Sequence, residues 1–545
     1  MVSAPKEDWH LISYERFNTT QDHAFNVWNA LQYCRETGED GLQFPKGTYD
    51  FYPDRAAERL LHVSNHDIYG EYRVAFPLCG MKHFTVDGGG STFLFHGCII
   101  PFLSEGSEGI TIENLTIDYP KILHLEGIVI ARGEDSLDIR IQSLDDYEIE
   151  GEILYFTDES GNRQRFHYLF VRGHDNRLPY TPDARDTWSD GKQVRFTELG
   201  DRTVRMFHPA EMVDVGTNVT LRCDRMRQAC NVVASDSKDL TVRNVTMLSS
   251  YAMGVLAQMT ENVTLEHLTV KAKPGYLDSL EADATHFVHC KGLVKVTDCA
   301  FSEQLDDALN IHGVFTKIIE KTGDYLLIRY MHDEAKGLNL YRSGDTFQTL
   351  DPKSLIPNGT YRVARAEIIN KDYTKLYVEG GTGAIREGDV VENLTWSCDL
   401  EFARNRVTNN RARGMLIAAK GKVRIHDNYF NTTGVAILFE SDGQYWFESG
   451  GTNDVEITGN TFDHCKYAHT WGNNVIEVVP RAAFREGEYY HQSIRVTGNR
   501  FVGNDYPLLS ADNVASVVFR DNRIEAQTGE PVVRFCRCGS VDCDV

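Results

Sequence analysis

The sequence predicts an all-β protein: a right-handed parallel β-helix with two inserted antiparallel β-barrel-like domains and an N-terminal capping helix. Three observations predict this fold. A short strand phrase recurs along the chain, two long segments with hairpin-like patterns interrupt it, and one helical pattern precedes the first strands. The chain has 545 residues, of which 41% are hydrophobic and 25% are charged, so it can bury a large core.

The first 60 residues contain one helical pattern, in which apolar side chains at Ala24, Val27, Leu31 and Tyr33 follow helical spacing. This segment precedes the strand-like phrase GLQFPKGTYDF. We therefore expect the helix to cap the open end of the β-helix and to hide its first edge strand. We assign residues 1–120 to this cap and to the first coils, which include the phrase GITIENLTI around Asn114.

The recurring phrase has the period-2 alternation of a strand, then a polar corner residue, then a second short strand. The corner residues are Asn244, His267, Asp298, Asn405, Asn428, Asn460, Asn499 and Asn522. The intervals between them are 23, 31, 107, 23, 32, 39 and 23 residues. Three intervals of 23 indicate a 23-residue coil with inserted loops of varying length. A β-rich unit of this length predicts a parallel β-helix whose coils stack at roughly 4.8 Å, and the L-x-x-L-x-L pattern of leucine-rich repeats is not present.

Two segments that interrupt the repeat, residues 121–210 and 316–395, contain long alternating strands that end at Gly and Asp turns. The phrases SLDIRIQSL and DYLLIRYM are examples, one from each segment. Each segment has the size of a small barrel or sandwich, so we expect two inserted β domains. The β-helix then occupies residues 211–315, which carry the candidate catalytic residues, and residues 396–545, which form its C-terminal coils.

The chain carries 56 Lys and Arg against 79 Asp and Glu, a net charge of −23. This balance argues against a nucleic-acid partner and disfavours an anionic polymer as substrate. No window reaches the roughly 18 apolar residues of a membrane span. The N-terminus lacks the pattern of a signal peptide, so we expect a cytoplasmic protein or a secreted or periplasmic one trimmed of its signal.

Twelve cysteines in 545 residues are too few for a disulfide scaffold. Six of them lie in apolar strand-like contexts, where we expect buried free thiols: Cys34, Cys79, Cys98, Cys290, Cys299 and Cys398. The C-terminal C-x-C-x4-C of Cys536, Cys538 and Cys543 has no obvious fourth ligand, so we expect no metal there.

The densest polar cluster runs from Glu281 to Gly313 and contains Asp283, Asp306 and Asp307. Asp306 follows Asp283 by 23 residues, which is one coil, so the two side chains are expected on one wall. Stacked carboxylates repel each other, whereas glycoside hydrolysis needs such a pair as acid and base. Turn capping or a calcium site is the alternative. Since neighbours in a strand face opposite ways, Asp306 and Asp307 can both reach a substrate only where the strand bends.

Eight further residues are candidates for substrate binding: His286, Asn310, His312, Arg411, Arg413, Glu440, Trp446 and Glu448. Arg413 lies eight residues past its corner, as Asp306 does, and Glu440 lies 12 past its corner, as Asn310 does. An Arg here could clamp sugar hydroxyls or form a structural ion pair. Trp446 could stack on a sugar face or lie in the core. The phrase HTWGNNVIEV, residues 469–478, is a weaker candidate of the same kind.

In the phrases ADATHFVHCKG, LDDALNIHG, NNRARGMLI and WFESG, the sequence resembles glycoside hydrolase family 110, the inverting exo-α-1,3-galactosidases that act on blood-group-B-type and related glycans. The resemblance runs over the whole β-helix and implies a β-helix interrupted by barrel-like insertions. It implies a catalytic Asp on one coil, matching Asp283, that faces an Asp-Asp pair on the next, matching Asp306 and Asp307. It implies no metal and no cofactor, and a galactosylated glycan as the partner.

For an inverting mechanism we expect Asp283 to be the general acid, with Asp306 and Asp307 positioning and deprotonating the water. The carboxyl groups would then lie about 6.5–9.5 Å apart, so their side chains would have to diverge. Three other functions remain: a polygalacturonase-like hydrolase, a calcium-dependent polysaccharide lyase, and a non-catalytic glycan-binding shaft. The sequence does not indicate the oligomeric state, or a preference for branched or linear galactosides.

Overall fold

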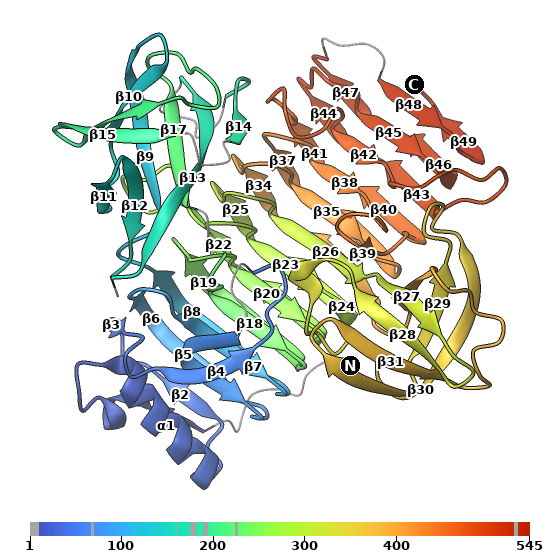
Figure 1. Cartoon of the computed structure of the whole chain (residues 1–545), viewed down its shortest axis with the longest axis horizontal. Helices are drawn as coiled ribbons and strands as arrows, with labels where there is room; N and C mark the ends of the chain where they lie inside the picture. Colours follow the sequence, from blue (N-terminus) through green and yellow to red (C-terminus); the bar gives the residue numbers. More distant parts are fainter. Residues whose placement is uncertain are drawn as a thin grey trace.

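The chain folds around a parallel β-helix that runs from the N-terminal to the C-terminal coils (Figure 1). The computed structural model describes residues 10–66, 70–159, 161–174, 181–188, 194–223, 227–527 and 532–545. Almost every described element is a strand, and the coils of the β-helix pair in parallel, which confirms the predicted fold class. In this part of the chain, no helix is long and apolar enough to cross a membrane.

Two walls of the β-helix form one continuous sheet, because most coils contribute two strands to it on either side of a corner. Its strands are β1 (Leu11–Ser13), β2 (Gly41–Gln43), β3 (Thr48–Phe51), β6 (Thr85–Phe95), β8 (Thr111–Asp118), β19 (Lys238–Met247), β21 (Glu261–Glu266), β22 (Thr269–Val270), β24 (Lys291–Thr297), β25 (Ala300–Ser302), β33 (Cys398–Ala403), β34 (Arg406–Thr408), β36 (Lys422–His426), β37 (Tyr429–Asn431), β40 (Asp454–Thr458), β41 (Thr461–Asp463), β43 (His491–Thr497), β44 (Arg500–Val502), β46 (Val514–Arg520), β47 (Arg523–Glu525) and β49 (Ser540–Cys543).

The third wall is a separate sheet, here called the site sheet because the candidate site lies on it. Its strands are β4 (Ala57–Leu61), β5 (Gly70–Cys79), β7 (Ile100–Glu105), β18 (Val232–Ser235), β20 (Val255–Gln258), β23 (Thr285–Val288), β26 (Leu309–Val314), β35 (Met415–Ala418), β38 (Ile437–Phe439), β42 (Ile476–Val478), β45 (Leu509–Asp512) and β48 (Val533–Cys536), with the short β39 (Glu448–Ser449) pairing β26 in antiparallel fashion.

The predicted N-terminal helix is α1 (His23–Thr37), which follows the short 3-10 helix η1 (Tyr14–Phe17). The Asp22 side chain accepts a hydrogen bond from the N–H of Ala24, and Gly38 ends the helix with a φ of 76° that suits glycine. α1 packs against β3 and β5 at the N-terminal end of the β-helix. The expectation for Tyr33 is not met, because this side chain is only half-buried and its hydroxyl accepts from Arg16.

The corners of the coils are held by a left-handed residue followed by an asparagine ladder. Asp298, Arg404 and Asp427 have φ values of 59°, 56° and 58°. The residue after Arg404 is Asn405, which begins a ladder in which each Asn Oδ1 accepts the backbone N–H of the coil before it: Asn405, Asn428, Asn460, Asn499 and Asn522. The corner markers chosen from the sequence therefore belong to two adjacent positions: Asn244, His267 and Asp298 are left-handed residues, whereas the markers from Asn405 onward are ladder residues one position later. The equivalent of Asp298 is Arg404, not Asn405, so register inferred across the second insert was wrong by one residue.

Inside the β-helix, phenylalanines of successive coils stack on one another. The stack contains Phe301, Phe402, Phe430, Phe462 and Phe501, with centroid separations between neighbours of 6.3, 6.2, 5.2 and 4.8 Å. All five side chains are buried. Phe402 lies just before its corner, and each of the other four is the central residue of the second short strand of its coil, so the apolar alternation of the phrase places them in the core.

The first interruption of the repeat forms an antiparallel sheet, which lies beside the coils in Figure 1. Its strands are β9 (His124–Arg132), β10 (Ser136–Ile141), β11 (Tyr147–Glu150), β12 (Ile153–Thr157), β13 (Arg163–Gly173), β14 (Arg185–Trp188), β15 (Arg195–Gly200), β16 (Thr203–Phe207) and β17 (Asn218–Cys223). The two ends of the sheet meet where the N–H of Phe196 donates to the carbonyl of Glu152 at 2.8 Å, so the sheet is barrel-like.

The second interruption forms a closed antiparallel barrel. Its strands are β27 (Thr316–Lys321), β28 (Tyr325–Tyr330), β29 (Thr346–Leu350), β30 (Pro357–Asn370), β31 (Tyr373–Val378) and β32 (Val390–Asn393). Its core includes Ile328, Phe347 and Leu376. The 3-10 helix η2 (Asp333–Ala335) follows β28 and brings Glu334 to the candidate site.

The cysteines are free thiols throughout. Cys34, Cys290, Cys299 and Cys398 are buried as expected, whereas Cys79 and Cys98 are only half-buried. Cys536 is exposed, and Cys538 and Cys543 are half-buried.

Candidate active site

A cavity of about 610 Å³ opens on the site sheet and is also lined by residues of both inserts. Nine of the eleven residues singled out in the sequence line it: Asp283, His286, Asp306, Asn310, Arg411, Arg413, Glu440, Trp446 and Glu448. The other two, Asp307 and His312, are buried directly behind it. Residues that are up to 165 positions apart in the sequence therefore share one cavity, because the coils stack.

The register of the site sheet explains this convergence. Thr285 pairs with Leu309, Leu309 with Met415, and Met415 with Ile437. Two positions before these strands, Asp283 therefore stacks on Asp307, and Asp307 stacks on Arg413. The sequence-based pairing of Asp283 with Asp306 was wrong by one residue, because the coil at this wall is 24 residues long and not 23. Glu440 is likewise level with His312 rather than with Asn310.

Asp306 and Asp307 face different ways, as the strand-alternation argument required. They lie in a bend before β26, where Asp306 lines the cavity and the Asp307 side chain is 0% exposed. Asp307 Oδ1 accepts from the backbone N–H and the Nε of Arg413, at 3.0 and 2.9 Å. The backbone N–H of Asp307 donates to Asp283 Oδ1 at 3.2 Å. Asp307 therefore anchors Arg413 and Asp283, and Asp306 is the member of the pair that a ligand can touch.

Three guanidinium groups surround Asp306. Arg411 Nη1 lies 3.4 Å from its Oδ1, and Arg227 Nη2 lies 3.5 Å from its Oδ2. Burial alone would raise the pKa of Asp306, but Arg411, Arg227 and Arg413 outweigh it and hold that pKa below its ordinary value. Asp306 is therefore an ionised carboxylate at neutral pH.

Asp283 has the opposite electrostatic environment. Burial, followed by the negative charge of Asp306, raises the pKa of Asp283 to about 7. Burial raises the pKa of Asp307 to about 8 in spite of Arg413. The carboxyl triad, Asp283, Asp306 and Asp307, thus combines an ionised group that faces the cavity with groups that retain protons. Carboxyl groups whose pKa values are pushed apart in this way can serve as acid and base.

The triad is more compact than expected. One oxygen from each of the three carboxyl groups lies within 4.8 Å of the others. An inverting mechanism was expected to need 6.5–9.5 Å and diverging side chains, whereas these side chains converge. The positive charges of Arg227, Arg411 and Arg413 make this crowding possible, because they reduce the repulsion between the carboxylates.

His286 and His312 contact Asp283 and each other rather than projecting freely into the cavity. His286 Nδ1 lies 2.5 Å from Asp283 Oδ2, and His286 Nε2 lies 3.0 Å from His312 Nε2. The Oδ1 atom of Asn310, which neighbours His286 across the strands, is buried and has no hydrogen-bond partner among the described residues. Asn310 is therefore available to a polar ligand, whereas the two histidines already have protein partners.

The remaining predicted residues occupy the rim of the cavity. Arg411 makes a bidentate ion pair with Asp186 of the first insert, at 2.5 and 3.0 Å, so the structural alternative for this Arg holds in part. Glu440 forms an ion pair with Arg481. Trp446 is 38% exposed and packs 4.8 Å from the ring of His332, so it is not a core residue.

Several residues of the cavity were not found from the sequence. Asp186 and Tyr168 come from the first insert, Glu334 comes from the second, and Arg227 precedes β18. Arg227 bridges two regions, since it also lies 3.2 Å from Glu334. These segments lie outside the repeat, so the sequence alone did not indicate that their residues would reach the cavity. Trp471 and Glu477, in the weaker phrase 469–478, do line the cavity.

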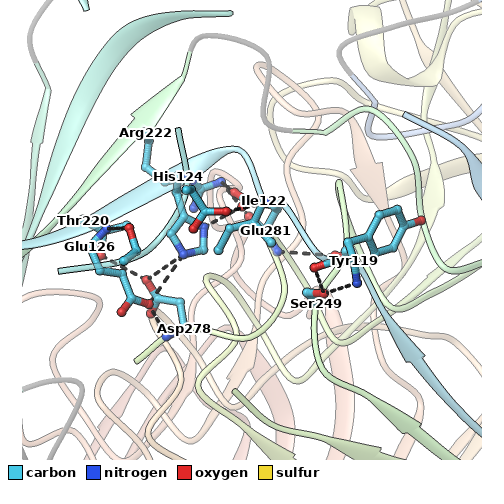
Figure 2. A network of polar contacts seen from close by, with 12 residues as sticks. Tyr119, Ile122, His124, Glu126, Thr220, Arg222, Ser249, Asp278 and Glu281 are labelled. Carbon is cyan, nitrogen blue, oxygen red and sulfur yellow. Dashed lines mark hydrogen bonds and ion pairs between the residues drawn. The ribbon is translucent and has the colours of Figure 1, made fainter. Parts of the chain in front are cut away.

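A second buried polar cluster lies beside the cavity, where the first insert meets the β-helix (Figure 2). This sealed cluster consists of Glu126, Asp278, Glu281, His124, Arg172 and Arg222, all nearly inaccessible to solvent. His124 Nδ1 lies 2.6 Å from Glu281, and Arg222 lies 2.8 Å from Glu281 Oε2. Burial would lower the pKa of His124, but Glu281 and Glu126 raise it above its ordinary value. With His124 protonated, three carboxylates face three cations.

These two clusters are where the described residues bring three potential ligand atoms for a metal within 4.8 Å of each other. Each cluster contains at least two guanidinium groups, whose positive charges balance the carboxylates without a metal ion.

Comparisons with known proteins identify relatives of this chain. A family model described as GLAA-B beta-barrel domain II matches residues 325–391, which lie in the closed barrel. Alpha-1,3-galactosidase A of Shewanella woodyi is 30% identical over 517 residues, covering 93% of this chain and 84% of that protein. An alpha-1,3-galactosidase B of Phocaeicola vulgatus is 31% identical over 532 residues, covering 90% and 84%. Among solved structures, a family 28 exopolygalacturonase of Yersinia enterocolitica aligns with a TM-score of 0.40 at 11% identity, over 99% of this chain and 79% of that one. The chain belongs to the α-1,3-galactosidase family and is a glycoside hydrolase.

Proposed function

We propose that this protein is an exo-acting α-1,3-galactosidase of glycoside hydrolase family 110, which releases terminal galactose from blood-group-B-type or linear α-1,3-galactosyl glycans with inversion. The single observation that carries the proposal is the convergence of the carboxyl triad at one cavity, with Asp283 and Asp306 in its lining and one oxygen of each of the three carboxyl groups within 4.8 Å of the others. The names and coverage of the relatives support the substrate class.

Asp283 acts as the general acid in this proposal. Its pKa of about 7 leaves a large share of the carboxyl protonated at neutral pH, so it can donate to the departing glycosidic oxygen. Asp306 acts as the general base, because it is ionised and lines the cavity, and it takes a proton from the attacking water. Asp307 acts through others, holding Arg413 and the Asp283 carboxyl in place.

Terminal galactose is bound by polar groups at the floor and by an aromatic rim. Asn310 Oδ1, with no protein partner among the described residues, accepts a sugar hydroxyl, and Arg413 and Glu448 offer charged contacts on the same face. Trp446 presents an exposed indole on which the apolar face of a sugar can stack, and Tyr445 and His332 extend this surface. His312, which is buried behind the cavity, does not contact the sugar in this proposal.

The charge of the cavity favours a neutral sugar over a uronate. Eight carboxyl side chains line the cavity against four guanidinium groups: Asp186, Glu281, Asp283, Asp306, Glu334, Glu440, Glu448 and Glu477 against Arg227, Arg411, Arg413 and Arg481. An anionic polymer such as polygalacturonate needs a surplus of positive charge at its binding site. The polygalacturonase-like alternative is therefore the weaker one.

A direct assay tests the proposal. Galactose release is measured from the branched B trisaccharide, from linear Galα1-3Gal, from p-nitrophenyl α-galactoside and from trigalacturonate. We expect release from one or both α-1,3-galactosides and no turnover of trigalacturonate. Asp306→Asn, which keeps the shape of the side chain, serves as the inactive control. Turnover of trigalacturonate alone, or equal release by Asp306→Asn, would refute the proposal.

A further inference from the structure

Two buried histidines, His286 and His312, lie behind Asp283, and the proposed mechanism gives them no task. They sit on the adjacent strands β23 and β26, with their rings 5.2 Å apart and nearly perpendicular. Together with Asp283 they form a chain of short contacts that ends at the backbone. His312 Nδ1 lies 2.7 Å from the carbonyl oxygen of Gly313, and His286 links His312 to Asp283.

When both histidines are neutral, the chemistry of these contacts fixes the direction of each hydrogen bond. A carbonyl oxygen only accepts, so the proton of a neutral His312 lies on Nδ1, and its Nε2 is an acceptor. The contact between the two Nε2 atoms then requires His286 to donate from Nε2. A neutral His286 with its proton on Nε2 has a bare Nδ1, which can only accept. The 2.5 Å contact therefore requires Asp283 Oδ2 to carry the proton and donate it.

We propose that His286 and His312 are positioning residues that hold a proton on Asp283, with the Gly313 carbonyl setting the direction of the whole chain. This inference rests on the proposed role of Asp283 as the general acid. The histidines supply no proton themselves. When Asp283 gives its proton to the leaving oxygen, water attacks the anomeric carbon and gives a proton to Asp306, and transfer of that proton from Asp306 to Asp283 restores the starting state.

Burial supports a neutral His286. Burial, followed by the neighbouring His312, lowers the pKa of His286 well below its ordinary value. The charged and titratable groups that face Asp283 and the two histidines come from several elements. They are Arg227, Cys230, Asp306, Asp307, Arg413, Glu448, His66 and His289. Glu448, whose Oε1 lies 3.7 Å from His312 Nε2, is a neighbouring carboxylate that raises the pKa of His286 and so opposes its neutral form.

Two substitutions at His312 separate the hydrogen-bond direction from packing. His312→Leu removes the acceptor, so His286 is free to place its proton on Nδ1 and donate to an ionised Asp283. His312→Gln keeps an oxygen where Nε2 lies and restores the acceptor. We expect the alkaline limb of the pH profile of kcat/KM to move to lower pH by about one unit in His312→Leu, and to stay at the wild-type position in His312→Gln.

A measurement that needs no activity completes the test. In wild-type protein with ¹⁵N-labelled histidine, NMR should show a neutral His286 protonated at Nε2 and a His312 protonated at Nδ1, with His312→Gln and His286→Asn used to assign the signals. A His286 protonated at Nδ1, or an unshifted alkaline limb in a folded His312→Leu, would overturn the inference. Wild type that releases no galactose would instead refute the proposed function, and the NMR result would still decide this one.

Discussion

Two buried clusters, which are linked in the sequence by Glu281 of one and Asp283 of the other, contain the same kinds of group. The sealed cluster, with Glu281, and the carboxyl triad, with Asp283, each combine three carboxyl groups with arginines and a histidine. The triad faces the cavity through Asp283 and Asp306, whereas the sealed cluster contributes to its lining only Glu281, which is 1% exposed. In the sealed cluster Glu281 and Glu126 raise the pKa of His124, whereas beside the triad burial lowers the pKa of His286 and raises the pKa of Asp283.

The comparison teaches that the number of buried charges does not distinguish a catalytic site from a structural one. The two kinds of site are distinguished by access to the cavity and by the difference in protonation between the carboxyl groups. In the sealed cluster each carboxylate is matched by a cation, so the cluster ties the first insert to the β-helix. In the triad the carboxyl groups differ in protonation, which is the state that acid–base chemistry requires.

The largest expected effect is on catalysis. Asp306→Asn should lower kcat by about 10²–10⁴-fold, because it removes the base without changing the size of the side chain. The melting temperature should stay close to that of wild type. Asp307→Asn is the matched comparison, because it changes the buried carboxyl group that holds Arg413 and should lower both activity and melting temperature. Loss of folding in Asp306→Asn with normal activity in the remaining folded protein would contradict the assignment.

The next effect concerns the sealed cluster. Arg222→Met removes the partner of Glu281 in a fully buried setting, and should destabilise the protein by about 3–5 kcal/mol. Denaturant unfolding measures this change. Arg73→Met, at the exposed pair with Glu58, is the control and should change stability by at most about 1 kcal/mol. Equal stability of the two variants would show that the sealed cluster is not structural.

A pH dependence of stability follows from His124. Because its pKa is raised in the folded protein, the contribution of His124 to stability is complete below about pH 6.5, its unfolded value, and is lost as the pH rises through the folded pKa. The difference in melting temperature between wild type and His124→Gln should therefore shrink from pH 6 to higher pH. A difference that grows with pH would mean that His124 is neutral in the folded state.

The smallest effect is expected at the rim. Trp446→Ala should raise KM by about 3–10-fold with little change in kcat, since it removes a stacking surface without touching the triad. Steady-state kinetics on Galα1-3Gal measure both constants. Phe301→Ala is a contrasting aromatic substitution, because that ring is buried in the stack and should cost stability instead. A fall in kcat with unchanged KM in Trp446→Ala would count against a binding role.

The recurring strand phrase was enough to predict the β-helix, because its alternation places Phe430 and Phe462 in one buried stack although 32 residues separate them. The register across the second insert was not predictable to the residue. Arg404 and Asn405 are both plausible corner residues in the sequence, and only their backbone conformations tell them apart.

The same limit applies to the site. The triad and most of its neighbours lie on coils, so the repeat placed them together. Asp186 and Glu334 reach the cavity from the inserts, and their positions depend on how each insert docks on the β-helix, which no local pattern encodes. The burial of Asp307 could also be learned only from the structure, because the bend before β26 decides which of the two adjacent Asp residues faces the cavity.

The central claim is a single displacement in which Asp283 protonates the leaving oxygen and Asp306 activates water. Proton NMR of galactose at the earliest times of Galα1-3Gal hydrolysis tests it most directly, and the compact triad makes the result informative. We predict that the β anomer is released first. Initial release of the α anomer would mean retention, and would contradict the account by making one of the triad carboxylates a nucleophile.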